Sequence, residues 1–490
     1  MATFLGLDAG TTAVTAVLYD ETLAVLSHAS REVPLQTPRP GWVEHDAKGI
    51  VSAALAVAEE ACGAHGAPDA IGITNQRETV VAWDAETHSP LCPAIVWQCR
   101  RTADRCSELR EEGHEDLIRR ATGLVVDPYF SATKMEWLLA NDEAVAGAAA
   151  AGRLRLGTVD AWVAASLTGG TWATDPSNAS RTMLYDIGTG AWSEDLCGLF
   201  GVDRSWLPEV RPSAGDYGVT ADGVLGGGVP ITGMIGDQQS ALFGQGCHAR
   251  GEVKCTIGTG SFLLVNAGEE RPEDVPGLLT TIGAGPDGSA CYALEGAVFI
   301  SGAAVQWIRD GLGLIEEAQE IEALASSVED SGGVTFVPAF AGLGAPYWDS
   351  GARGALLGLT RGAGPGHIAR ATLEAMAHQD RELIELFDTG LGEGEDSIAQ
   401  VRMDGGGAHN DVLMQIHADF FGRPVVRAAD VDATARGAAW LAAVGAGIEV
   451  TPGHAGEDRF DPRMPAADRE AAAQVWREAV ARVLTREATS

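Results

Sequence analysis

Short apolar runs that end at polar turns recur along the chain, separated by longer amphipathic stretches. The first run, Phe4–Asp20, predicts a strand, a Gly/Thr turn and a returning strand. A second run of the same order, Glu252–Asn266, follows about half a chain later. A Gly/Thr turn offers hydroxyls and free backbone N–H groups, so both runs predict hairpins that bind phosphate. For either one alone, an ordinary hairpin with a polar turn stays open as the alternative.

Two further stretches run from an apolar strand into a helix. Residues 229–243 predict a strand followed by a helix, with Asp237 at the junction. Open α/β sheets bind ligands just beyond the carboxyl ends of their strands, although an Asp at this position also serves as a helix N-cap. Residues 401–420 pass from a strand through three glycines into a helix, which predicts a phosphate or nucleotide site formed by backbone N–H groups.

Charged side chains lie between two apolar strands near residue 77. The strand Ala70–Thr74 is followed by Arg77 and Glu78, and another strand covers Thr79–Trp83. Charged residues in such a place are uncommon unless they are paired or functional, so a local ion pair is the alternative to a binding role. Residues 171–186, further along, read as a polar strand and turn.

Length favours more than one domain. At 490 residues the chain is too long for a single core. The two similar hairpins favour two related halves, and we place the boundary near residue 245, giving domains at 1–245 and 246–490.

Charge and lysine usage exclude several function classes. The 68 acidic and 34 basic residues give a net charge of −34, which argues against nucleic acid or an anionic membrane surface as a partner. A Walker A loop needs Gly-Lys-Ser/Thr. None of the three lysines, Lys48, Lys134 and Lys254, follows a glycine or precedes Ser or Thr, so P-loop chemistry is excluded.

Cysteine spacing and the chain start favour a cytoplasmic protein. The eight cysteines contain no C-x-x-C pair and are read as free thiols in a reducing compartment. The N-terminus lacks a basic region, and Asp8 interrupts it too early for a signal peptide. No stretch is expected to span a membrane.

Two aspartates meet the minimum needed for phosphoryl transfer. Asp8 and Asp237 both follow strands and could take Mg²⁺ and a substrate hydroxyl. Phosphoryl transfer depends on neutralised charge, positioning and a carboxylate that accepts the alcohol proton. A nucleotide held in a cleft between the two halves would complete such a site.

The chain resembles the FGGY carbohydrate kinases, and within them the members that act on glycerol, over essentially its whole length. The matching stretches are Ile71–Glu78, Ile95–Thr102, Asn178–Leu184, Gly236–Gln239, Leu242–Gln245, Gly342–Trp348, Gly354–Leu359 and His367–Glu374. The resemblance implies two ribonuclease-H-like α/β domains of the actin-like ATPase type, with the catalytic site in the cleft between them.

The resemblance also implies roles for individual residues. Asp237 is the general base and, with Asp8, a ligand of Mg²⁺. The residues expected to hold glycerol, or a related polyol, are Arg77, Glu78, Trp97, Tyr129, Asp237, Gln238 and Phe262. The residues expected to bind ATP are Thr11, Thr12, Thr259, Gly302, Gln306, Gly406 and Asn410.

Two positions depart from the family pattern. Ala9 and Thr15 stand where glycerol-phosphorylating relatives commonly carry Gln and Arg. The missing Arg removes one donor to the γ-phosphate, so either another residue replaces it or the phosphate is held more weakly.

Alternative functions stay open at this point. Another FGGY kinase would act on dihydroxyacetone, erythritol or xylulose, although xylulose kinases usually carry Met-His-Gly where this chain has Gln76-Arg77-Glu78. An actin-like ATPase without kinase activity would need a further peptide-binding or filament-forming part. The sequence leaves open whether the chain forms a homo-oligomer.

Overall fold

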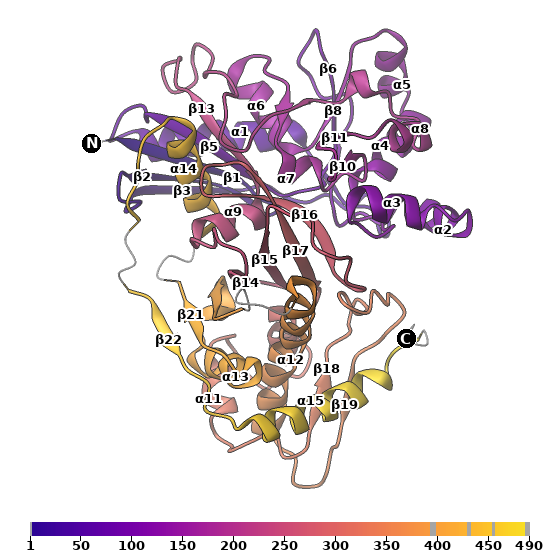
Figure 1. Cartoon of the computed structure of the whole chain (residues 1–490), viewed down its shortest axis with the longest axis vertical. Helices are drawn as coiled ribbons and strands as arrows, with labels where there is room; N and C mark the ends of the chain where they lie inside the picture. The colour runs from indigo at the N-terminus through magenta and orange to yellow at the C-terminus, as the bar shows by residue number, and fades with distance from the viewer. Residues whose placement is uncertain (1, 393–397, 429–432, 453–455, 486–490) are drawn as a thin grey trace.

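The computed structural model describes residues 2–392, 398–428, 433–452 and 456–485. The chain forms two lobes, one built mainly from the first half of the sequence and one from the second (Figure 1). Each lobe contains one large mixed sheet.

The sheet of the first lobe has five strands. Its strands β1, β2 and β3 pair antiparallel, whereas β5 and β13 run parallel to β1. In spatial order they are β13 (Ile231–Gly236), β5 (Ala70–Asn75), β1 (Thr3–Ala9), β2 (Ala13–Asp20) and β3 (Val25–Glu32).

The sheet of the second lobe has seven strands. Strands β14, β15 and β17 pair antiparallel, and β20 and β21 continue the sheet parallel to β14. The order is β16 (Leu279–Ala284), β17 (Ala290–Val298), β15 (Ser261–Gly268), β14 (Val253–Ile257), β20 (Val401–Asp404), β21 (Val425–Arg427) and β22 (Asp458–Phe460).

The two sheets share one arrangement. Across each sheet, three neighbouring antiparallel strands are followed by two strands that run parallel to the third. The order is β3-β2-β1-β5-β13 in the first sheet and β17-β15-β14-β20-β21 in the second. The predicted pair of phosphate-loop hairpins is β1–β2 and β14–β15. The predicted fold class, two ribonuclease-H-like α/β domains, is therefore confirmed.

Helices cover both faces of the first sheet. Leu5 and Leu7 of β1 face α1 (Ala47–Cys62) and α6 (Val159–Thr168). Phe4 and neighbouring residues on the opposite face pack against α14 (Ala433–Gly445). Although α14 comes late in the sequence, it lies in the upper lobe beside β1 and β13 (Figure 1).

Helices of the second half cover the second sheet. Val253, Cys255 and Ile257 of β14 pack in one core with α12 (Pro365–Leu391) and α13 (Asp411–Phe421). The remaining helices of this lobe are α10 (Gly302–Asp310), α11 (Glu320–Ala325), α15 (Ala466–Ala481) and the 3₁₀ turn η2 (Gly406–His409), and the remaining strands are β18 (Thr335–Val337) and β19 (Ala355–Leu357).

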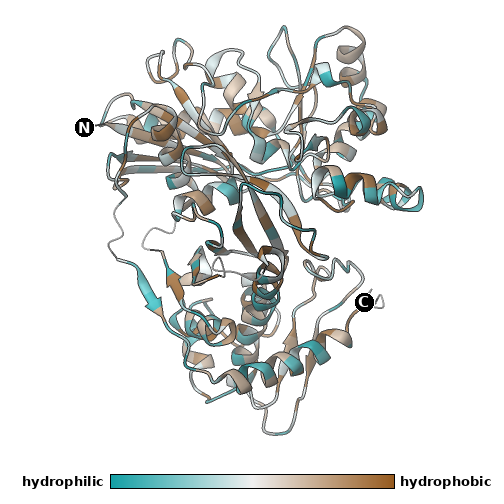
Figure 2. Cartoon of the chain, viewed as in Figure 1, coloured by the Kyte–Doolittle hydropathy of each residue, from teal (hydrophilic) through white to brown (hydrophobic). Residues whose placement is uncertain are grey.

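An extension of the first lobe surrounds the Arg77 region. Its helices are α2 (Ala103–Glu111), α3 (Glu115–Thr122), α4 (Ser131–Asn141), α5 (Glu143–Ala150), α7 (Pro176–Ala179), α8 (Glu194–Leu199) and the 3₁₀ turn η1 (Arg204–Trp206). Its short strands are β4 (Glu44–His45), β6 (Val81–Asp84), β7 (Ala94–Ile95), β8 (Leu154–Gly157), β9 (Ala173–Thr174), β10 (Tyr185–Asp186), β11 (Ala191–Trp192) and β12 (Glu209–Val210). Hydrophobic residues follow the inner strands, and hydrophilic residues gather on outer helices such as α2 and α15 (Figure 2).

Candidate active site

Three parallel strands of the first sheet end at one edge and bring the predicted polar residues together. Ala9 of β1 is paired with Asn75 of β5, and Asn75 with Gly236 of β13. Asp8 therefore lies at the end of β1 and Asp237 directly after β13, on either side of β5. Adjacent strands are about 4.8 Å apart, so the ends of β1 and β13 are separated by roughly 10 Å across the end of β5. A phosphate group and a metal ion could lie beyond the end of β5, between the two carboxylates.

Asp237 is the first residue of α9 (Asp237–Gly244) rather than its N-cap, which is Gly236. Its side chain is 27% exposed, and its Oδ1 accepts a hydrogen bond from the backbone N–H of Gln238 at 2.7 Å. Burial raises the pKa of the Asp237 carboxyl above its ordinary value, against the opposing effects of Arg77 and Lys254. A partly buried carboxylate whose pKa is raised in this way is suited to accept a proton.

Arg77 is buried and joins residues from both lobes. Its two terminal nitrogens donate to Glu295 of β17 at 2.7 and 2.9 Å. One of them also donates to Gln239 at 3.1 Å, and the other to the Tyr129 hydroxyl at 3.4 Å. The Nε atom lies 3.2 Å from Asp237 Oδ1. The predicted alternative of a local Arg77–Glu78 ion pair does not hold as the main contact, because Arg77 Nε and Glu78 Oε1 are 3.9 Å apart.

Glu78 is paired with a different arginine. Arg181 Nε donates to Glu78 Oε1 at 2.6 Å, and Arg181 Nη2 lies 3.2 Å from Glu295 Oε1. Glu78, Arg181 and Glu295 are each at most 1% exposed. Burial raises the pKa of Glu78, whereas Arg181 and Arg77 hold the pKa of Glu295 at about 2 in spite of its burial.

The short helix α7 packs against the strand ends at the candidate site. Where the sequence predicted a polar strand and turn, residues 176–179 form the buried helix α7, which Asp175 caps through the backbone N–H groups of Ser177 and Asn178. Asn178 exchanges side-chain hydrogen bonds with Asn75 at 3.0 and 3.2 Å. The polar sequence pattern gave the wrong prediction for these residues because their side chains form hydrogen bonds with one another inside the lobe instead of with water.

The aromatic rings of Trp97 and Tyr129 form one wall of the candidate site. Trp97 and Tyr129 pack edge to face with ring centroids 5.5 Å apart, and the Trp97 indole N–H donates to Thr11 Oγ1 at 2.9 Å. Phe262 lies on β15, partly buried and paired with Ala297 of β17. Residues two apart on a strand share a face, so Phe262 is on the same face of the second sheet as Glu295.

Gln238 contacts a buried lysine. Lys254 of β14 donates to the side-chain oxygen of Gln238 and, at 2.9 Å, to Thr256 Oγ1. Its ammonium group is fully buried, and burial lowers its pKa. The first turn of α9 is thereby attached to the second sheet.

The two Gly/Thr turns present exposed threonines. Thr12 and Thr259 are exposed and Thr11 is half-buried. The turn at Gly258–Gly260 accepts backbone hydrogen bonds from the start of α10, including Gly302 N–H to Gly258 O at 3.0 Å. A Cβ atom at Gly302 would lie 2.4 Å from that oxygen, so only glycine allows this approach.

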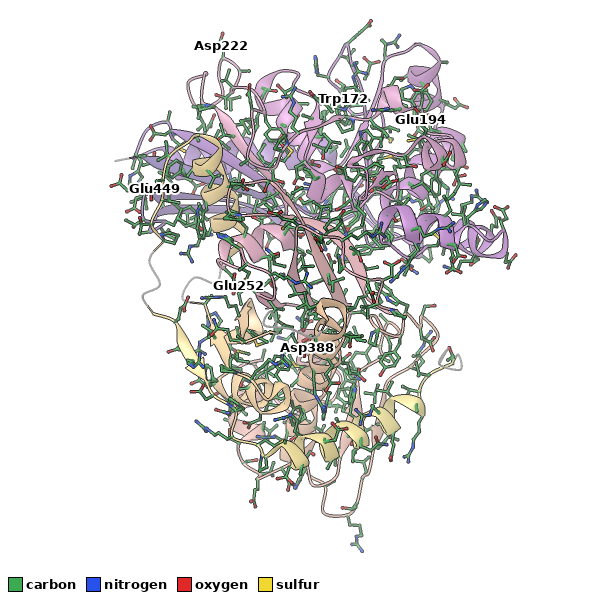
Figure 3. The ribbon with its side chains drawn as sticks, in the orientation of Figure 1. Trp172, Glu194, Asp222, Glu252, Asp388 and Glu449 are labelled. Carbon is green, nitrogen blue, oxygen red and sulfur yellow. The ribbon has the colours of Figure 1, made fainter. Side chains whose placement is uncertain are left out.

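A cavity of about 340 Å³ opens in the second lobe. Its wall includes four of the residues expected to bind nucleotide, Gly302, Gln306, Gly406 and Asn410. Apolar residues such as Ile257 and Leu413 line much of the rest, together with the polar side chains of Gln319, Glu322 and His409. In Figure 3 the labelled Glu252, just before β14, lies between the upper lobe, marked by Trp172 and Glu194, and the lower lobe, marked by Asp388.

Four residues of the site were not singled out from the sequence. They are Arg181, Gln239, Lys254 and Glu295. Glu295 carried a signal, since it is the one charged residue in the otherwise uncharged strand Ala290–Val298. Lys254, one of only three lysines in the chain, carried a similar signal in β14.

Some features are absent from the described residues. Within them, no three or more His, Cys, Asp or Glu side chains are grouped so as to hold a metal ion. None of the helices in the described ranges is long and apolar enough to cross a bilayer.

Family models match both halves of the chain. The N-terminal domain of the FGGY family of carbohydrate kinases matches residues 3–244, and its C-terminal domain matches residues 253–446.

Individual relatives match nearly the whole chain. The chain is 51% identical to a glycerol kinase of Aromatoleum aromaticum, over 98% of this chain and 99% of that protein. It is 48% identical to glycerol kinase 2 of Thermotoga maritima, over 98% of each. Among solved structures, Plasmodium falciparum glycerol kinase with ADP superposes with a TM-score of 0.91 at 33% identity, covering 99% of both chains. A xylulose kinase of Rhodospirillum rubrum gives a TM-score of 0.85 at 27% identity, covering 98% of both.

Proposed function

Since the chain belongs to the FGGY family of carbohydrate kinases, we propose that it transfers the γ-phosphate of ATP to a terminal hydroxyl of glycerol, giving sn-glycerol 3-phosphate. The observation that carries the proposal is the partly buried Asp237 directly after β13, 3.2 Å from Arg77. Relatives at about half identity over the full chain are glycerol kinases, which favours glycerol among the polyols.

The polyol site is formed by charged, amide and aromatic groups. Arg77, Glu78 and Tyr129 supply hydrogen-bonding groups to the hydroxyls, and Gln238 adds an amide. Trp97 and Phe262 cover the carbon chain, each only partly buried. A triol presents three hydroxyls and a small apolar edge, and these residue types match both parts.

Asp237 acts as the general base in the transfer. The terminal hydroxyl oxygen forms a bond to the γ-phosphorus, and its proton passes to the Asp237 carboxylate. The bond between that phosphorus and the β,γ-bridging oxygen breaks, and ADP leaves with the electron pair. Arg77, beside Asp237, fixes the orientation of the carboxylate.

Donors in the two hairpin turns would hold the phosphates. Thr11, Thr12 and Thr259 offer hydroxyls and backbone N–H groups in exposed or half-buried turns. Thr15 stands where related kinases commonly carry Arg, and its hydroxyl contacts Ser30 Oγ at 3.0 Å within the sheet. Residue 15 therefore supplies no positive charge to the γ-phosphate. The adenosine part of ATP would fill the cavity lined by Gly302, Gln306, Gly406 and Asn410.

Asp8 and Asp237 fit a magnesium ion. Both provide hard carboxylate oxygens at the edge where the phosphates would lie, and Mg²⁺ in kinases is bound by one or two carboxylates together with substrate phosphates. When bound there, Mg²⁺ would neutralise part of the negative charge of the phosphates.

The proposal is tested by measuring ADP release with glycerol, dihydroxyacetone, erythritol and xylulose as separate substrates. We expect kcat/KM for glycerol to exceed each of the others by at least about 10-fold. A higher value for any other polyol or ketose would replace glycerol as the substrate. ADP release that does not depend on a polyol would favour an actin-like ATPase instead.

A further inference from the structure

The two terminal nitrogens of Arg77 already hold a carboxylate. Glu295 Oε2 accepts from one at 2.7 Å and Glu295 Oε1 from the other at 2.9 Å, which is the bidentate geometry by which arginine recognises carboxylates. The remaining donors of Arg77 are directed at Gln239, Tyr129 and Asp237. No pair of donors on Arg77 is left to hold a carboxylate of a substrate.

Glu295 is a fixed part of the protein. It is fully buried in the middle of β17, where Leu264 of β15 and Leu279 of β16 are paired with it. Arg181 lies 3.2 Å from the same carboxylate. With its pKa at about 2, Glu295 is ionised at neutral pH.

The charges around the polyol site are balanced. The guanidinium groups of Arg77 and Arg181 face the carboxylates of Glu78 and Glu295, and all four side chains are at most 2% exposed. Asp237 adds a further carboxylate beside Arg77. Lys254, a further buried cation beside the site, already donates to Gln238 and Thr256. An anionic group entering here would meet three carboxylates and cations that already have partners, which disfavours it.

We propose that Glu295 is a specificity-determining residue that selects an uncharged polyol over the corresponding hydroxy acid, by occupying the carboxylate-binding side of Arg77. This inference rests on the proposed function, since it concerns the polyol site. Glu295 itself does not touch the substrate in this account. It acts through Arg77, whose two terminal nitrogens it holds, so that no bidentate pair of donors faces a substrate carboxylate.

The test compares glycerol with glycerate, which differs by one carboxylate and keeps a terminal hydroxyl. Transfer to glycerate joins that hydroxyl oxygen to the γ-phosphorus, moves its proton to Asp237 and releases ADP. We expect Glu295→Gln, which removes the charge but keeps the shape, to lower kcat/KM for glycerol. We expect the glycerate-to-glycerol ratio of kcat/KM to rise at least about 10-fold, because the terminal nitrogens of Arg77 then lack their carboxylate partner and favour an anion.

Two matched variants distinguish the effect of the Glu295 charge from an effect on packing around Arg77. Glu295→Asp keeps the charge and is expected to keep the wild-type ratio. Gln239→Met removes a neutral acceptor from the same Arg77 nitrogen and is expected to lower kcat/KM for glycerol without raising the ratio. If Glu295→Gln lowers activity on glycerol but leaves the ratio unchanged, Glu295 only positions Arg77 and the specificity inference is wrong.

A measurement on the unmodified protein keeps the inference testable should Glu295→Gln fail to fold. Glycerate is expected to inhibit glycerol phosphorylation only at concentrations at least about 100-fold above the KM for glycerol. Inhibition near that KM would overturn the inference. If the unmodified protein does not phosphorylate glycerol at all, the proposed function fails, and this outcome is distinct from a failed role for Glu295.

Discussion

At the scale of single residues, Arg77 connects the candidate site to both lobes. It lies just after β5 of the first sheet, yet its strongest contacts are with Glu295 of the second sheet, 218 residues later in the sequence. A buried arginine with a bidentate partner has a fixed orientation. The position of Asp237, 3.2 Å from Arg77, therefore depends on how the two lobes meet.

His378 is expected to make the protein sensitive to acid. It lies on α12, with ring centroids 4.2 Å from Phe420 and 5.3 Å from Trp476. Burial, aided by Arg381 and Arg477, lowers its pKa to about 3 from 6.5. The unfolded chain thus binds more protons between these values, so the free energy of unfolding falls as the pH falls, by about 1.4 kcal/mol per pH unit.

His378→Phe keeps an aromatic ring and removes this proton. Chemical denaturation at pH 7 and pH 5 is expected to show a smaller loss of stability in the variant than in the wild type. Contributions of carboxylates are common to both proteins and cancel in the comparison. An equal loss in both would contradict a neutral His378 in the folded state.

Residue-level prediction from the sequence was guided by charge that interrupts an apolar pattern. Arg77, Glu78 and Asp237 adjoin buried strands, and the structure brings them to one edge. Glu295 and Arg181 were missed because their partners are remote in the chain, and local periodicity carries no information on such pairs. The substrate, metal and nucleotide roles of individual residues stay predictions.

At the scale of elements, a row of glycines seats α14 on the first sheet. Gly6, Gly72 and Gly233 are side by side in β1, β5 and β13. A Cβ atom would lie 2.0 Å from the Ala435 oxygen at Gly6, and 1.9 Å from the Ala438 oxygen at Gly72. The helix backbone therefore lies directly on the sheet, which explains why glycine occurs in three consecutive buried strands.

Gly72→Ala is expected to push α14 off the central strand and to destabilise the protein by about 1–3 kcal/mol, the usual cost of overpacking. Thermal unfolding measures the change. Gly147→Ala in α5 is the matched control, because a Cβ atom there meets no atom within 4 Å. Alanine in that helix is expected to leave stability unchanged or to raise it slightly. Equal midpoints for Gly72→Ala and the wild type would refute the close packing.

Gly406, at the start of η2, borders the nucleotide cavity. Neither strain nor crowding requires glycine here, since its φ is not positive and a Cβ atom meets nothing within 4 Å. We expect Gly406→Val to fold normally, to raise the KM for ATP about 10-fold by filling the cavity, and to leave the KM for glycerol unchanged. Steady-state kinetics with each substrate varied in turn measure both KM values. An unaltered KM for ATP would show that the nucleotide does not bind in this cavity.

At the scale of the whole molecule, the two halves share a five-strand arrangement, to which the second sheet adds β16 and β22 at its edges. The repeated hairpins made this duplication predictable from the sequence. The return of α14 to the first sheet was not predictable, because an Ala-rich helix fits either lobe and only the glycine row selects the first. The boundary near residue 245 separates the strands of the two sheets, and the domain ranges drawn from it stay a prediction.

The most direct test of the account follows the product. Purified protein with glycerol, ATP and Mg²⁺ is monitored by phosphorus NMR, alongside Asp237→Asn. We expect the wild type to form sn-glycerol 3-phosphate and ADP in equal amounts, and the variant to be slower by about 100-fold or more, as expected for loss of a general base. ADP formed without glycerol phosphate, or an Asp237→Asn variant as fast as the wild type, would contradict the account.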